Sequence, residues 1–157
     1  MNKLEIGWKK SIFSIYQGEY RELRIDGEFT VNLVSKMYQE DDFFRGLVPA
    51  YSGWLSHKEE EQWVFERLLP QNNAICPILI CPDDQDFSCT VVVVEIIKKP
   101  ESILWKRMGR VFHHHNHDNT HMLGETIAWR GKNINKEFEL IEYESIINRL
   151  KAARNEN

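Results

Sequence analysis

The sequence predicts an α+β fold, with a mostly antiparallel sheet of about six strands and two to three helices packed on it. Short apolar or alternating segments recur between turn residues, which is the pattern of strands joined by hairpins. Two other segments repeat apolar residues at helical spacing. The chain has 157 residues, of which 42% are hydrophobic and 28% are charged. This size and composition predict a single globular domain over residues 1–157, with residues 153–157 frayed.

The N-terminal part predicts a first strand at residues 11–17 and then a hairpin around Asp26 and Gly27, which lie between two alternating segments. A two-residue loop would place the apolar rows of the two hairpin strands on opposite faces, whereas an odd-length loop places them on the same face. We therefore expect a three-residue loop or a bulge that pairs Ile25 with Phe29. Gly27 or a neighbour should then have a positive φ.

The alternation stops after this hairpin. Residues 34–44 have the spacing of a short helix, and residues 46–55 read as a loop that carries aromatic side chains. A helix is expected over residues 57–69, because an apolar stripe there follows a capping box with Ser56 as N-cap and Glu59 at the third helical position.

Five further strands are expected, at residues 75–81, 88–98, 102–112, 124–130 and 136–143. The second of them is apolar on both faces, which indicates a central strand. A turn at Lys99–Glu101 makes its connection to the third strand a hairpin. The chain ends in a helix, because apolar residues recur there at helical spacing, at Tyr143, Ile146, Ile147 and Leu150.

Charge and hydropathy limit the classes of function. The formal net charge is −4, with no long block of one sign. This argues against a nucleic-acid binder or a protein of anionic membranes, and it favours a basic partner. The N-terminal stretch MNKLEIGWKK lacks the apolar core of a signal peptide, and the longest apolar stretch, TVVVVEII, is too short to cross a bilayer. We therefore expect a cytoplasmic protein.

The chain has three cysteines, Cys76, Cys81 and Cys89, which cannot all pair with one another. Two of them lie in or beside apolar strand segments. In a reducing compartment, we interpret the three as buried thiols rather than as disulfides or metal ligands.

Five of the six histidines lie within residues 113–121. In a strand, His113, His115 and His117 would project to one face, and in a helix His113, His117 and His121 would align. Imidazole is a common zinc ligand, and Asp118 could add a carboxylate. The intervening residues favour turns, however, and a loop does not supply the rigid ligands of a built zinc site. We favour an exposed loop and keep the metal site as the alternative.

A second group of candidate ligands, Asp83, Asp84 and Asp86, follows the strand at 75–81. Such a group can hold magnesium or calcium. These residues lack the spacing of a calcium-binding loop, and Asp is common in turns, so we favour a plain turn.

Glu95 interrupts the valine run of the strand at 88–98. It is expected either to pair with Arg107 or Arg110 on the next strand, or to lie where its own strand leaves the core. The second interpretation is slightly favoured.

Aromatic residues gather in residues 43–54, which read as a loop. Because loops run mostly over the surface, these side chains predict a recognition patch, although they could instead cover one end of the sheet as core. Acidic residues flank the stretch, and an aromatic centre with an acidic rim suits a basic partner. The residues expected to contact this partner are Asp41, Asp42, Phe44, Tyr51, Trp54, Glu60 and Glu61.

The function expected is that of a non-catalytic, cytoplasmic protein-binding domain. In size, acidity and aromatic content the chain is similar to bacterial toxin-immunity proteins, a likeness that includes no motif and transfers no residue. No HExxH, G-x-S-x-G or glycine-rich phosphate loop is present, so no catalytic residue or cofactor is assigned. The alternative is a metal-binding protein or metal-dependent hydrolase that uses His113, His115, His117 and His121, with zinc as the possible metal. A small-molecule sensor is a third hypothesis.

Overall fold

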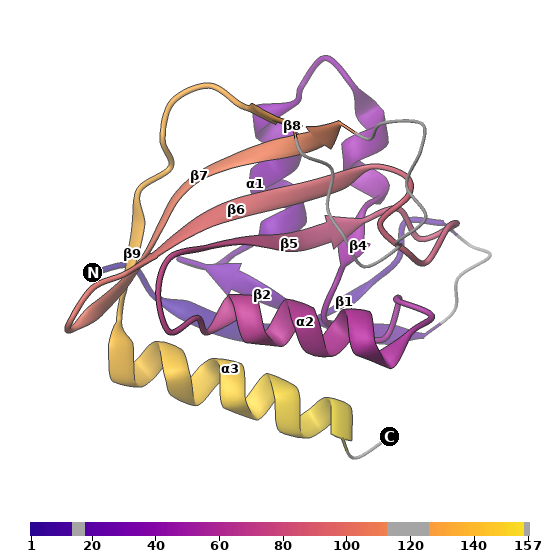
Figure 1. Cartoon of the computed structure of the whole chain (residues 1–157). Helices are drawn as coiled ribbons and strands as arrows, with labels where there is room; N and C mark the ends of the chain where they lie inside the picture. Colours follow the sequence, from indigo (N-terminus) through magenta and orange to yellow (C-terminus); the bar gives the residue numbers. More distant parts are fainter. Residues whose placement is uncertain (14–17, 113–125, 156–157) are drawn as a thin grey trace.

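The computed structural model describes residues 1–13, 18–112 and 126–155, and within them it confirms an α+β fold with mostly antiparallel sheets (Figure 1). The smaller sheet has the order β1 (Leu4–Lys10), β2 (Glu19–Ile25), β3 (Glu28–Phe29). The larger sheet has the order β4 (Val48–Pro49), β5 (Ala74–Ile80), β6 (Val91–Lys98), β7 (Ser102–Phe112), β8 (Thr126–Trp129), and β9 (Lys136–Glu139) also pairs with β7.

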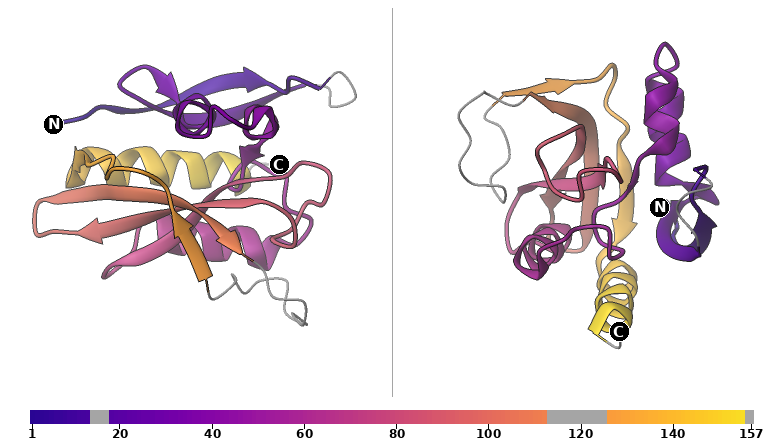
Figure 2. Two further views of the ribbon diagram at one scale, coloured as in Figure 1. Left: turned by 90° about the horizontal axis from the view of Figure 1, so that it is seen from above. Right: turned by 90° about the vertical axis from the view of Figure 1, so that its right-hand side faces the viewer.

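The helices of the described residues are α1 (Thr30–Met37), the 3-10 helix η1 (Asp42–Gly46), α2 (Lys58–Leu68) and α3 (Leu140–Asn155). Figure 2 shows the larger sheet between the smaller sheet on one side and α2 on the other. Helix α3 contacts β1 of the smaller sheet as well as β7 and β9 of the larger one. Buried side chains of both sheets therefore belong to one hydrophobic core.

Strand β7 is the centre of the larger sheet. One of its edges pairs with β6, and its other edge is divided between β8 near Phe112 and β9 near Ser102. The valines of β6 are buried on both faces, which confirms the central position that the sequence predicts. The predicted hairpin between β6 and β7 is confirmed as well.

The N-terminal predictions are corrected in two places. The first strand is β1, at Leu4–Lys10, whereas residues 11–13 lie outside any strand and residues 14–17 are outside the described residues. The hairpin loop has two residues, because Ile25 pairs with Glu28, so the predicted odd-length loop is wrong. The predicted positive φ is confirmed at Gly27 and is also found at Asp26.

The reason for the two-residue loop is that β3 ends at Phe29, where α1 begins. Val31 and Val34 are buried from this helix, so the apolar residues after Phe29 never have to align with those of β2 across a sheet. The repeat of apolar residues changes from the two-residue period of a strand to the 3.6-residue period of a helix within one segment. The sequence pattern therefore predicts a continuous strand there.

The predicted helix boundaries also shift. The first helix is at 30–37 rather than 34–44. The predicted capping box before α2 is absent: His57 is the N-cap, and Ser56 bonds Gln85 instead. The last predicted strand, 136–143, ends at Glu139, because the Glu139 carboxylate accepts hydrogen bonds from the first-turn N–H groups of α3.

A buried hydrogen-bond chain joins β7, α3 and α2. Trp105 Nε1 donates to the Tyr143 hydroxyl at 3.1 Å, and this hydroxyl donates to the carbonyl of Leu68. Phe138 packs edge-on against the Trp105 ring, with 5.8 Å between the ring centroids. All three polar groups are satisfied inside the core, so the chain fixes the position of α3 relative to both neighbours.

Strand β3 pairs with β2 only at Arg24 and Ile25, and side chains complete the rest of this edge of β2. The Leu23 N–H donates to the Tyr51 hydroxyl at 3.0 Å, and Ser52 Oγ donates to the Arg21 carbonyl. These bonds attach the smaller sheet to the segment that follows β4, and they explain why the Tyr51 side chain is fully buried.

Glu22 is a buried carboxyl group on β2, with 0% of the residue exposed. Neither of its oxygens has a well-oriented hydrogen-bond partner among the described residues. Burial raises the pKa of Glu22 to about 8, although Lys9 and the Val31 N–H lie near enough to oppose the shift. Glu22 is therefore neutral in the folded protein at neutral pH.

Replacing Tyr143 with Phe should lower the free energy of unfolding by about 1–3 kcal/mol, because it leaves the Trp105 N–H and the Leu68 carbonyl buried without a partner. Urea denaturation measures the change. Tyr38→Phe is the matched control, because the buried Tyr38 hydroxyl has no hydrogen-bond partner among the described residues. Equal losses in the two variants would contradict the role of the hydrogen-bond chain.

The Glu22 carboxyl should make the protein less stable as pH rises. Between about pH 4.5 and about pH 8 the folded protein keeps the proton that the unfolded chain has released, so the free energy of unfolding falls across this window and levels above it.

Glu22→Gln should remove this pH dependence. Between these limits, the free energy of unfolding of the variant should therefore rise relative to that of the native protein by up to about 1.4 kcal/mol per pH unit. Urea denaturation at several pH values measures it. Glu19→Gln, on an exposed residue of the same strand, should give a profile parallel to that of the native protein. A parallel profile for Glu22→Gln would show that the buried carboxyl is not the cause.

Candidate functional site

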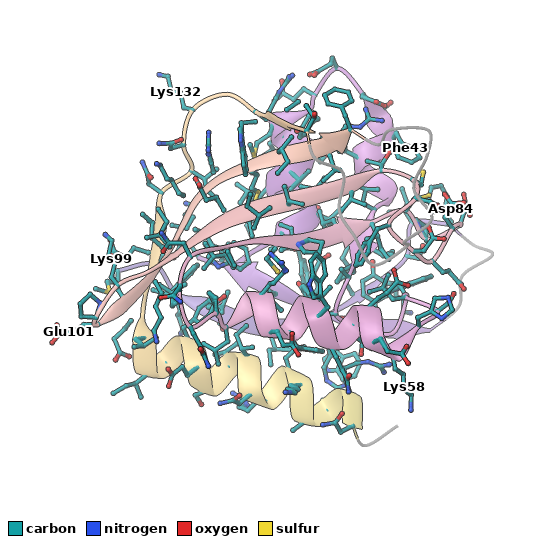
Figure 3. The ribbon with its side chains drawn as sticks, in the orientation of Figure 1. Phe43, Lys58, Asp84, Lys99, Glu101 and Lys132 are labelled. Carbon is teal, nitrogen blue, oxygen red and sulfur yellow. The ribbon has the colours of Figure 1, made fainter. Side chains whose placement is uncertain are left out.

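Three segments meet at one end of the larger sheet. Ile80, the last residue of β5, pairs with Val91 of β6 on one side and with Val48 of β4 on the other. The connection between β5 and β6 therefore leaves the sheet where η1 enters it. Ser56, just before α2, is hydrogen-bonded to this connection. We call this surface, residues 41–46, 56–59 and 81–90, the loop end. Figure 3 labels Phe43, Lys58 and Asp84 on it.

The 81–90 connection is held at several points. Gln85 accepts hydrogen bonds from Ser56, at 2.9 Å to its backbone carbonyl and at 3.1 Å to its side chain. Phe87 is buried against Trp63, with 5.7 Å between the ring centroids. Asp86 Oδ1 accepts from the backbone N–H and the hydroxyl of Ser88. Asp86 therefore has the turn role that the sequence predicts for the acidic group.

The three cysteines are free thiols. Cys76 and Cys81 are buried, as the sequence predicts, and burial raises the pKa of Cys76 far above its ordinary value. Cys89 is half-buried, and burial together with a hydrogen bond to Asp84 raises its pKa to about 11. The buried-thiol prediction thus fits Cys76 and Cys81 better than Cys89.

One group in the described part of the chain has the composition of a metal site. One donor atom from each of Cys81, Asp84 and Cys89 lies within 4.8 Å of the other two. Sequence reasoning separated these residues, because it assigned the cysteines to the core and Asp84 to a turn. The spacing matches no familiar cysteine motif, and only the pairing of β5 with β6 brings the two thiols together.

The residues predicted to bind a partner divide between surface and core. Asp41 and Asp42 are exposed, and the Asp41 carboxylate caps η1 by accepting from the Phe43 N–H at 3.0 Å. Phe44 is 1% exposed and stacks on Tyr38, with 4.0 Å between the centroids. Tyr51 is buried at the edge of β2. The structure thus places Phe44 and Tyr51 in the core, whereas the neighbouring Phe43 is 43% exposed.

The acidic residues in the first turn of α2 differ in exposure as well. Glu60 is fully buried. Glu61 is mostly covered, where it accepts from Arg154 Nε at 2.7 Å and from the Gly53 N–H at 3.0 Å. Trp54 is half-buried and packs edge-on against Tyr20, with 5.5 Å between the centroids. Trp54, Glu60 and Glu61 are therefore each at least partly buried in the fold.

The histidine cluster is not part of the described structure. His113, His115, His117, His121 and Asp118 all lie outside the described residues, which end at Phe112 and resume at Thr126. The metal-site prediction for these residues therefore stays a prediction.

Glu95 pairs with Arg107, as one of the two interpretations predicted. Arg107 Nε donates to Glu95 Oε1 at 2.8 Å, and the guanidinium lies over the Trp129 ring, 4.0 Å from its centroid. The pair is part-buried on neighbouring strands, and each charge has a partner, so its role is structural.

A small pocket opens where the smaller sheet meets α3. Its volume is about 250 Å³, and Arg21, Ser52, Leu150 and Arg154 are among the residues that line it. Pockets for drug-sized ligands usually hold about 300–1,000 Å³ and are mostly apolar. This pocket is smaller, whereas a second pocket of about 410 Å³ beside Pro100, Leu140 and Ile141 falls within that range.

Comparison with protein-family models, with curated proteins and with solved structures gives no match. Within the described residues, no helix is long and apolar enough to cross a membrane.

Proposed function

We propose that the protein is a non-catalytic binding protein that captures a basic protein partner through its loop end. The observation that supports this proposal best is the presentation of Phe43. This large apolar side chain is exposed on a short 3-10 helix, directly after the exposed carboxylates of Asp41 and Asp42.

The position of Phe43 is fixed by its neighbours. Asp41 caps the start of η1, and Phe44 is stacked in the core on Tyr38. With Phe44 pointing inward, Phe43 has to point outward from the same helical turn. An exposed aromatic ring held on a rigid turn loses little entropy on binding, which is a property of interface hot spots.

The charge of the loop end suits a basic partner. Exposed acidic residues of the described loop end are Asp41, Asp42, Glu59, Asp83 and Asp84, whereas its exposed basic residues are Arg45 and Lys58. Acidic groups around an apolar centre would steer a lysine-rich or arginine-rich surface into contact, and would raise the association rate at low salt.

The specific form of the proposal is a cytoplasmic neutraliser of a basic protein, in the manner of bacterial immunity proteins. The likeness to such proteins remains one of size and composition. The proposed contact set is Asp41, Asp42 and Phe43. Of the other residues predicted from the sequence, it leaves out the buried Phe44, Tyr51 and Glu60 and the part-buried Trp54 and Glu61.

The test starts from capture of partners on the immobilised protein, followed by titration of the purified partner against defined variants. Phe43→Ala should weaken binding at least about tenfold, as expected for an aromatic hot spot. Asp42→Lys should slow association and reduce its dependence on salt. Asp42→Lys should leave the urea midpoint unchanged, because the side chain is exposed, and Phe43→Ala should lower it only slightly, because it removes the edge-on contact with Phe44.

The matched control is Glu101→Lys, which makes the same charge change at the opposite end of the molecule (Figure 3). This variant should bind like the native protein. Equal affinity for all the variants, or a partner that is itself acidic, would contradict the proposed surface.

A further inference from the structure

We propose that Cys81, Asp84 and Cys89 form a binding site for one zinc-class divalent ion. The three donor atoms lie within 4.8 Å of one another in the described structure. Donor atoms around a tetrahedral zinc ion with two sulfur ligands stand about 3.5–3.8 Å apart, as follows from Zn–S distances of about 2.3 Å. Small side-chain rotations that move the donor atoms by about 1 Å would therefore bring the group to zinc geometry.

The two thiols are brought together by the sheet. Cys81 directly follows Ile80, and Cys89 lies two residues before Val91, and these two strand residues are paired. The ladder between β5 and β6 therefore fixes both ends of the connection that holds all three ligands. A metal at this position would close the connection at its base.

The connection is already rigid, which lowers the entropic cost of binding. Ser56 holds Gln85, the residue after Asp84, at its carbonyl and at its side chain. Phe87 is buried against Trp63 between Asp84 and Cys89. Gln85 has a φ of +57°, so the chain reverses directly after the carboxylate ligand.

The donor set selects the metal. Magnesium and calcium prefer oxygen ligands alone, whereas two thiolates with one carboxylate suit zinc, and cobalt(II) or cadmium as its substitutes. Three protein ligands leave a fourth position, and Asp84 is exposed, so water can occupy it. The site belongs to residues other than the histidines of the 113–121 run.

Binding requires deprotonation of both thiols. One divalent ion and two thiols give the metal dithiolate and two free protons, with the Asp84 carboxylate as third ligand. Because both thiols must lose their protons before they can bind the metal, apparent affinity should increase with pH over the neutral range. The proposal is independent of the binding surface at Asp41, Asp42 and Phe43.

The test is a cobalt(II) titration of the reduced full chain, followed by displacement with zinc against a chelator of known affinity. Cobalt is chosen because a thiolate-to-cobalt charge-transfer band reports sulfur ligands, and imidazoles from the histidine-rich run do not produce it. We expect one cobalt per chain with this band and with the visible spectrum of tetrahedral cobalt, and displacement by one zinc.

The variants separate the three ligands from their surroundings. Cys81→Ser/Cys89→Ser should abolish the thiolate band, and Asp84→Asn should weaken binding about tenfold or more. Asp83→Asn, the same change on the adjacent residue of the turn, should leave affinity unchanged, and so should Cys76→Ala. Cys89→Ser alone serves if the double variant does not fold, because Cys89 is half-buried.

Cobalt uptake without a thiolate band, or zinc affinity unchanged in the cysteine variants, would overturn the proposal and assign the metal to the histidine run or to no fixed site. Absence of stoichiometric metal binding by the native protein would overturn it as well. Zinc should also raise the melting temperature of the native protein and not that of the cysteine variant.

Discussion

The structure depends on the central position of β7. This strand pairs with β6 along one edge and with β8 and β9 along the other, and its Trp105 side chain holds Tyr143 of α3, which in turn reaches the end of α2. Each of these polar groups is buried and satisfied. Any displacement of β7 would therefore leave donors and acceptors without partners, and this would add to the free-energy cost of the lost packing. The register of β6 and β5 follows from that of β7.

That register also produces the loop end. Because Ile80 is paired on both sides, the connection from β5 to β6 and the 3-10 helix before β4 leave the sheet together. Two kinds of chemistry are then adjacent: an exposed aromatic ring with carboxylates on η1, and two thiols with a carboxylate at the base of the connection. Asp84 belongs to both, because its carboxylate adds to the negative charge of the loop end, but the contact residues Asp41, Asp42 and Phe43 are not among the proposed metal ligands.

The surface residues show where sequence reasoning reaches its limit. A loop rich in aromatic residues predicts a surface patch. In the structure, however, the Tyr51 hydroxyl accepts from the Leu23 N–H of β2, and Phe44 stacks on Tyr38, so both side chains are buried. A buried backbone N–H has to find an acceptor, and here the nearest one is a side chain distant in sequence. Which of two adjacent phenylalanines points inward depends on that packing, and no local pattern distinguishes Phe43 from Phe44.

The sequence by itself determined the α+β class, the central valine strand, the hairpin at Lys99–Glu101 and the helices α2 and α3, because period, turn residues and burial agree within each segment. It also contained the signal for a sharp reversal at Asp26–Gly27. Only the tertiary structure decided that the strand after this reversal becomes a helix, that the Ser56 side chain holds a distant turn instead of capping α2, and that Cys81, Asp84 and Cys89 converge. Those outcomes depend on partners far apart in the chain, whose free-energy contributions exceed the local preferences of about 1 kcal/mol on which sequence patterns rest.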